Sequence, residues 1–149
     1  MKVLLIGYGN PLRKDDGIGW RVVEEIEKGQ LFMANCQLST IVTHQLLPEL
    51  TGDVSEAELV IFVDASVEGE PGTIAVQALA PVEQRIGALT HHFDPAGLLG
   101  YARDLYGRFP RAYLVTITAV SLGYGEGLSP LIEALVPEIL QQIKQVVHL

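Results

Sequence analysis

Apolar residues along the chain alternate between short runs typical of strands and longer amphipathic patterns typical of helices. Five runs rich in Val, Ile, Leu and Thr predict strands, at Lys2–Gly7, Gln37–Thr43, Leu59–Asp64, Thr73–Leu79 and Arg111–Val120. Helical patterns lie between and after them, at Gly17–Lys28, Leu46–Leu50, Pro95–Leu105 and Ser129–Val147. This alternation predicts an α/β sandwich built on a mostly parallel sheet.

The direction of the fourth strand follows from the length of one connection. Only the short segment SVEGEPG lies between Asp64 and Thr73, whereas a parallel crossover needs about a dozen residues or more. We therefore expect the fourth strand to run antiparallel to its neighbour. Since no repeat, low-complexity segment or linker interrupts the pattern, we expect a single domain over residues 1–149.

Composition and charge narrow the class of partner. With 149 residues, 48% of them hydrophobic, the chain can bury one sizeable core. A net charge of −8 disfavours nucleic acid as a partner, because phosphate binding needs clustered Lys and Arg. No apolar run is long enough for membrane insertion, and the N-terminus lacks signal-peptide features. The single cysteine, Cys36, cannot form an intrachain disulfide, so we expect a cytoplasmic protein.

The stretch GYGNPLRKDDGIG, which follows the first strand, begins like a dinucleotide-binding turn and then departs from that pattern. Gly7 and Gly9 are present, but Pro11 restricts Asn10 to extended geometry and removes one backbone donor. The two adjacent aspartates that follow would repel a pyrophosphate. A Rossmann cofactor site is therefore a poor fit.

Three aspartates are candidates for chemistry at the carboxyl edge of the sheet. Asp15 and Asp16 can cap the next helix, and for Asp15 this structural role explains the residue as well as any function does. Asp16 lies in the first βα loop, where open α/β folds bind ligands. Asp64 ends the strand LVIFVD at the same edge, although it can also bond the following turn. Converging carboxylates without a basic neighbour usually share a proton or a metal.

Histidines in the segment LTHHFDPAGLL add nitrogen donors. His91 and His92 precede a helix for which Asp94 and Pro95 are a good N-cap and first residue. Two carboxylates and one imidazole can hold a divalent metal such as nickel or zinc and leave positions open. A serine hydrolase is disfavoured because the chain has no GxSxG elbow, and Cys36 lacks the surroundings of a thiol catalyst.

These segments together resemble the hydrogenase maturation endopeptidases, which remove a C-terminal extension from the large subunit of nickel–iron hydrogenases. GYGNPLRKDDGIG, IFVDA and THHFDP carry the resemblance in this order, over essentially the whole chain. It implies a three-layer α/β/α sandwich with a five-stranded mixed sheet of order 2-1-3-5-4 and an antiparallel strand 4. It also implies that Asp16, Asp64 and His91 are the catalytic and metal-binding trio, with His92 as the fallback ligand.

The resemblance also implies a substrate and a metal. The expected partner is the hydrogenase large-subunit precursor, which supplies the nickel, and zinc is another ion that the site can take. Many members carry a Gly-Gly-Thr loop after the second strand, whereas VTHQLLPEL here resembles the branch serving cytoplasmic, bidirectional, NAD-linked hydrogenases. Candidate substrate contacts are Asn10, Asp15, His44 and Gln45, and the alternative for His44 is a polar residue that leads into a helix.

Two other functions stay open at this point. One is a non-catalytic docking module or chaperone that binds the large subunit through the same metal-dependent trio. The other is a nucleotide-binding α/β domain, which nucleotide would stabilise against heat. Neither explains why acids and histidine coincide at one edge, so an endopeptidase is the function we expect.

Overall fold

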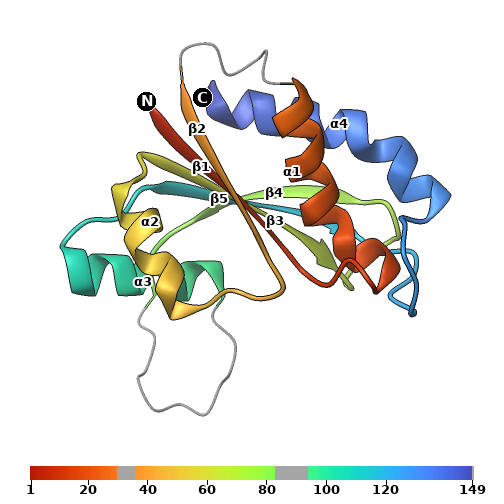
Figure 1. The fold of residues 1–149 in the computed structure, drawn as a ribbon, viewed down its shortest axis with the longest axis horizontal. Helices are drawn as coiled ribbons and strands as arrows, with labels where there is room; N and C mark the ends of the chain where they lie inside the picture. Colours follow the sequence, from red (N-terminus) through yellow and green to blue (C-terminus); the bar gives the residue numbers. More distant parts are fainter. Residues whose placement is uncertain (30–35, 83–93, 149) are drawn as a thin grey trace.

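The computed structural model describes residues 1–29, 36–82 and 94–148, which form a mixed sheet between two layers of helices (Figure 1). The strands are β1 (Lys2–Tyr8), β2 (Gln37–Thr43), β3 (Leu59–Ser66), β4 (Ile74–Leu79) and β5 (Arg111–Thr118). The helices are α1 (Ile18–Gly29), α2 (Thr51–Glu56), α3 (Pro95–Tyr106) and α4 (Pro130–Val147), with 3₁₀ turns η1 (Lys14–Gly17) and η3 (Pro48–Leu50). Within the described residues, no helix combines the length and apolar character that a membrane span needs.

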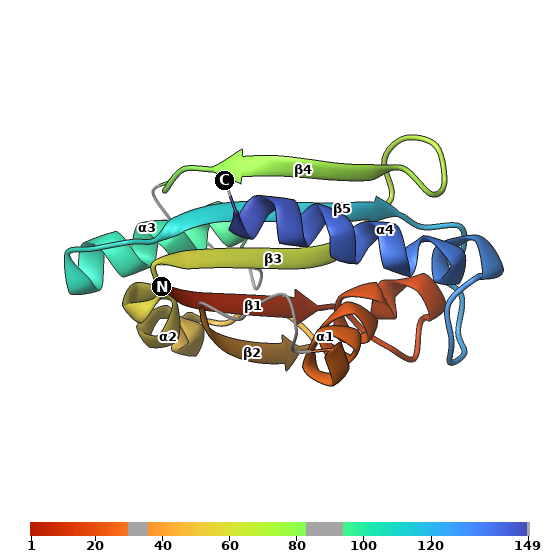
Figure 2. The ribbon, with the colours of Figure 1, turned by 90° about the horizontal axis from the view of Figure 1, so that it is seen from above.

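The five strands have the order β2-β1-β3-β5-β4, which confirms the expected topology. β1 pairs in parallel with β2 and β3, and β3 pairs in parallel with β5. β4 pairs antiparallel with β5, and in Figure 2 the arrows of these two strands point in opposite directions. The parallel strands therefore end at one common edge, where the loop after β1 and the segment after β5 lie.

Both faces of the central strands are buried, which explains their continuous apolar runs. Leu5 packs into a cluster with α1 and α4. Its neighbours Leu4 and Ile6 pack into a second cluster with α2 and α3 on the other face. Side chains alternate between the faces of a strand, so a sheet covered on both sides needs apolar residues at every position. The three-layer α/β/α sandwich is thereby confirmed.

The helical pattern at Leu46–Leu50 is confirmed only as the 3₁₀ turn η3 (Pro48–Leu50), and the α-helix α2 begins after it, at Thr51. The sequence TGDVSE has the composition of a turn, so its pattern does not predict a helix. Val54 is fully buried in the cluster between the sheet and α3, and this contact offsets the poor helix propensity. The fifth strand is also shorter than predicted and ends at Thr118.

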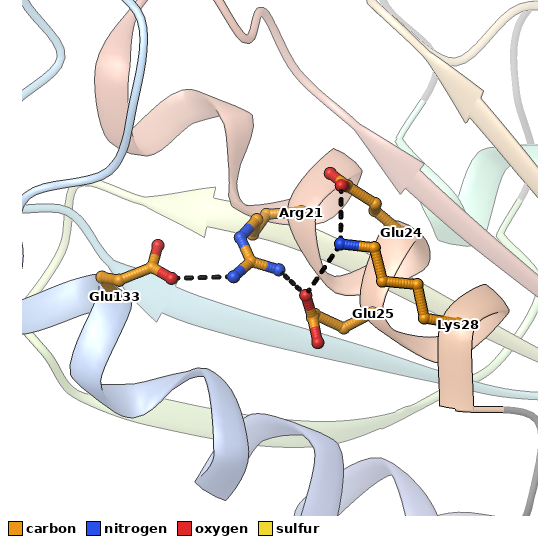
Figure 3. A network of polar contacts seen from close by, with 5 residues as sticks. All are labelled: Arg21, Glu24, Glu25, Lys28 and Glu133. Atoms are coloured by element: carbon orange, nitrogen blue, oxygen red, sulfur yellow. Dashed lines mark hydrogen bonds and ion pairs between the residues drawn. The ribbon is translucent and has the colours of Figure 1, made fainter.

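Polar contacts on the surface join α1 to α4 (Figure 3). Arg21 bridges Glu25 on its own helix and Glu133 on α4, where Nη2 lies 2.8 Å from Oε1. Lys28 pairs with Glu24 at 3.1 Å and with Glu25 at 3.6 Å. Such partly exposed pairs contribute little free energy, so the apolar cluster beneath them is the main attachment of the two helices.

Candidate functional site

The loop after β1 folds tightly over the carboxyl edge because glycines permit close contact. A Cβ atom on Gly7 would lie 2.2 Å from the carbonyl oxygen of Gly19, and one on Gly19 would lie 2.6 Å from that of Val63. Gly9 has a φ of +135°, and the carbonyl oxygen of Asp16 fills the space where its side chain would be. The start of α1 therefore lies directly against the ends of β1 and β3.

Asp16 closes this loop with its carboxylate. Its Oδ2 accepts a hydrogen bond from the Asn10 amide at 2.7 Å, and its own amide donates to the Arg13 carbonyl at 3.1 Å. The Asn10 side chain in turn accepts from the Leu12 amide at 2.9 Å. A carboxylate offers about four acceptor positions, so the half-buried Asp16 keeps capacity for a further ligand. Substrate contact by Asn10 stays a prediction.

Asp64 lies near the end of β3, close to Asp16. Its Oδ1 accepts from the Ala65 amide at 2.8 Å, and the Tyr8 hydroxyl also donates to its carboxylate. Burial raises the pKa of Asp64 to about 6, the Asp16 charge acts in the same direction, and the two hydrogen bonds oppose them. The two acids that the sequence singled out are therefore near enough to repel each other.

The start of α3 lies near the same edge. Asp94 caps this helix by accepting from the Gly97 amide at 2.6 Å, and Pro95 is the first helical residue, as predicted. Burial and the charges of Asp64 and Asp94 raise the pKa of the Tyr8 hydroxyl, so this hydroxyl remains a proton donor. The predicted ligands His91 and His92 lie outside the described residues, three and two positions before Asp94 in the chain.

Two members of the predicted metal trio, Asp16 and Asp64, lie within the residues that the structure describes. Within residues 1–29, 36–82 and 94–148, no group of three His, Cys, Asp or Glu side chains could hold a metal ion. No Lys or Arg of the described residues forms a salt bridge with Asp16 or Asp64. Paired carboxylates without a cation fit a divalent metal, so the chemistry of these two donors suits the expected site.

Asp15 points into the protein, and only 1% of its surface is exposed. Its Oδ2 accepts from the amides of Val120 and Ser121, at 2.9 Å each, and from the Ser129 hydroxyl at 2.8 Å. Its Oδ1 accepts from the Ser129 amide at 2.7 Å. Burial alone would raise the pKa of Asp15, but these hydrogen bonds outweigh it and hold the pKa below its usual range. The contacts favour a structural role over the substrate contact that we predicted for Asp15.

His44 and Gln45 are exposed and follow β2 at the same edge. The rings of His44 and Trp20 meet edge to face, with centroids 5.5 Å apart. Trp20 Nε1 donates to the carbonyls of Gly9 at 2.9 Å and Thr43 at 3.2 Å, so it joins the end of β2 to the first loop. Both exposed side chains are placed where a substrate could meet them, and their role stays a prediction.

Known proteins show the same fold and sequence pattern. The chain is 30% identical over 152 residues to the hydrogenase 2 maturation protease of Escherichia coli (strain K12), covering 96% of this chain and 88% of that protein. The chain belongs to the hydrogenase maturation proteases. The solved structure of the hydrogenase maturating endopeptidase HybD from E. coli matches with a TM-score of 0.71 at 29% identity, over 96% of this chain and 90% of the other. No protein-family model matches the chain.

A second solved structure supports the fold alone. The nickel–iron hydrogenase maturation protease HycI from Thermococcus kodakarensis has a TM-score of 0.74 at 22% identity, covering 99% of this chain and 93% of that one. The relatives are named as a maturation protease and a maturating endopeptidase, which confirms the endopeptidase that the sequence predicted.

Sequence reasoning about this maturation protease missed several residues around the site. Tyr8 reads as an apolar core residue, and only the register of β1 against β3 places it beside Asp64. Arg13 also escaped notice, although its guanidinium lies 6.0 Å from the centre of the Tyr124 ring and its Nε donates to the Leu122 carbonyl at 3.1 Å. These contacts join segments that are far apart in the chain, so no local pattern reveals them.

Proposed function

We propose that this maturation protease removes a C-terminal extension from the large-subunit precursor of a nickel–iron hydrogenase. The observation that carries the proposal is the pair of Asp16 and Asp64, which lie close together at the carboxyl edge of the sheet without a described cationic partner. His91 is the proposed third ligand, and His92 is the alternative in the same segment. The relatives that are named as endopeptidases support the reaction class.

Nickel belongs to the substrate in this proposal, since the precursor supplies it. Two carboxylates and one imidazole leave open positions on a first-row divalent ion, and thiolates of the precursor can fill them. Zinc accepts the same donors and can take the site as well. A metal ion held there polarises a carbonyl or activates water.

The side chains of the chain itself supply proton transfer and orientation. One of the two carboxylates is proposed to accept a proton from the attacking water. Asp16 is fixed by the Asn10 amide, so it presents its remaining oxygen positions in one direction. His44 and Gln45 are proposed to contact the precursor at the rim, and the sequence THQLL supports the branch that serves bidirectional, NAD-linked hydrogenases.

We also infer that the protein works in the cytoplasm as a single domain over residues 1–149. Its one cysteine, Cys36, is a free thiol, which fits a reducing compartment.

A panel of variants tests the roles of the proposed ligands. Asp16→Asn, Asp64→Asn and His91→Ala are each expected to abolish cleavage of nickel-loaded precursor while the far-ultraviolet circular dichroism is unchanged. The matched control is Asp53→Asn, because Asp53 is an exposed acid on α2 and should leave cleavage unchanged. Full cleavage by His91→Ala together with loss of cleavage in His92→Ala would make His92 the third ligand in place of His91. Full cleavage by Asp64→Asn would contradict the proposed site.

A further inference from the structure

Tyr8 is the last residue of β1, and the sheet places it beside Asp64. The register of β1 against β3 runs to the pair Gly7 and Val63, so Tyr8 and Asp64 are the next neighbours across the two strands. Phe62 lies in the cluster on the α2 and α3 face, and Tyr8 packs against this cluster. Because side chains alternate along a strand, Asp64 lies on the same face as Phe62 and Tyr8.

Two donors fix the Asp64 carboxylate. The Tyr8 hydroxyl donates to it, and the Ala65 amide donates to Oδ1 at 2.8 Å. Together these bonds restrict the rotation of the carboxylate about its χ2 angle. A carboxylate has about four acceptor positions, so two bonds leave positions open for a ligand.

A neutral hydrogen-bond donor is the suitable partner for the Asp64 carboxylate. The charge of Asp16 repels the Asp64 carboxylate and would favour its rotation away from the first loop. Lys or Arg at position 8 would hold the carboxylate, but either would also neutralise the charge that attracts a metal ion. A tyrosine hydroxyl holds the carboxylate and leaves this charge in place.

We propose that Tyr8 is a positioning residue, which holds the Asp64 carboxylate beside Asp16 in the orientation that the nickel-loaded precursor requires. The proposal rests on the proposed function of the site and extends it by one residue. Partners that orient metal ligands typically contribute about 10- to 100-fold in metal affinity or activity. Removal of the hydroxyl alone is therefore expected to have a measurable effect.

The test compares Tyr8→Phe with the matched control Tyr113→Phe. Tyr113 lies on β5 and packs against the cluster on the opposite face, so its hydroxyl is remote from Asp64. Each protein is stripped of metal and titrated with Ni²⁺ alone by calorimetry, and its kcat for nickel-loaded precursor is measured by mass spectrometry. Binding of nickel-free precursor is measured separately.

For Tyr8→Phe we expect Ni²⁺ binding to weaken about 10-fold or more and kcat to fall by a similar factor. Affinity for nickel-free precursor is expected to stay within about twofold, because the substitution removes one hydroxyl from a partly buried side chain and changes no charge. Tyr113→Phe is expected to match wild type in every measurement.

Wild-type Ni²⁺ affinity and kcat in Tyr8→Phe would overturn the positioning role. A variant that only melts at a lower temperature, with full affinity and rate below its transition, would overturn it as well. If wild type binds Ni²⁺ but leaves the precursor intact, the proposed function fails, and the Ni²⁺ titration alone decides the role of Tyr8. If wild type neither binds Ni²⁺ nor cleaves, both proposals fail.

Discussion

Replacement of Asp15 by asparagine is expected to destabilise the fold by about 3 kcal/mol. The amide oxygen of the new side chain can take the place of Oδ2 and keep its three donors, from Val120, Ser121 and the Ser129 hydroxyl. The amide nitrogen then replaces Oδ1 and meets the Ser129 N–H, whose present distance to the carboxylate is 2.7 Å. One donor is left unpaired, and the other three bonds lose their charge.

The magnitude follows from these two losses. An unpaired, largely buried donor costs about 1–3 kcal/mol, and a neutral hydrogen bond is weaker than a charged one by about 1 kcal/mol. Val120 is exposed and Ser121 and Ser129 are half-buried, so water recovers part of the loss. A net loss of about 3 kcal/mol is a large fraction of the stability of a domain, and it corresponds to a fall in Tm of about 6–12 °C.

Urea unfolding at several pH values measures the effect. The pKa of Asp15 is lower in the folded state than its unfolded value of about 3.9, so its contribution is complete above that pH and is lost as the pH falls through the folded pKa. The difference between wild type and Asp15→Asn should therefore be constant from about pH 5 to 8 and shrink below about pH 4.

An exposed aspartate serves as the control in this experiment. Asp53→Asn on α2 is expected to change the free energy of unfolding by less than about 0.5 kcal/mol. A loss below about 1 kcal/mol for Asp15→Asn at pH 7, or a loss that grows as the pH falls, would refute the structural role of Asp15.

Three further predictions concern other parts of the fold. Gly7→Ala would place a Cβ atom 2.2 Å from a backbone oxygen and is expected to unfold the protein or lower its Tm strongly, whereas Gly29→Ala meets no atom within 4 Å and should be neutral or stabilising in thermal melts. In metal-free protein, carbon-detected NMR should show Asp64 titrating near pH 6. Because this folded pKa is raised, Asp64→Asn should stabilise the protein above pH 6. A loss of stability in that pH range would contradict the inferred repulsion between Asp16 and Asp64. A double-mutant cycle of Arg21→Ala and Glu133→Ala should give a coupling below about 1 kcal/mol that shrinks in salt, and a larger, salt-independent value would show that the pair is not solvent-screened.

Much of the sheet could be predicted because its signals are local. Continuous apolar runs identified β1 and β3 as central strands, and one short connection gave the direction of β4. Helix α2 could not be predicted, since the burial of Val54 against α3 stabilises it and the propensity of TGDVSE does not.

The site shows the same division between local and long-range signals. Asp16 was identified from its loop after the first strand and Asp64 from its place at the end of a strand, and the structure places them close together. The burial of Asp15 depends on hydrogen bonds to residues 105 to 114 positions later in the chain, which no sequence pattern near Asp15 encodes. Tyr8 was missed because a tyrosine at the end of an apolar strand has the pattern of a core residue.

The most direct test of the proposed function is to mix the purified protein with nickel-loaded and nickel-free hydrogenase large-subunit precursor and to weigh the products by mass spectrometry. Loss of a C-terminal peptide from the nickel-loaded precursor alone is the predicted result. Binding without shortening of either precursor would contradict it and would favour a docking module, while equal cleavage of both would contradict recognition through nickel.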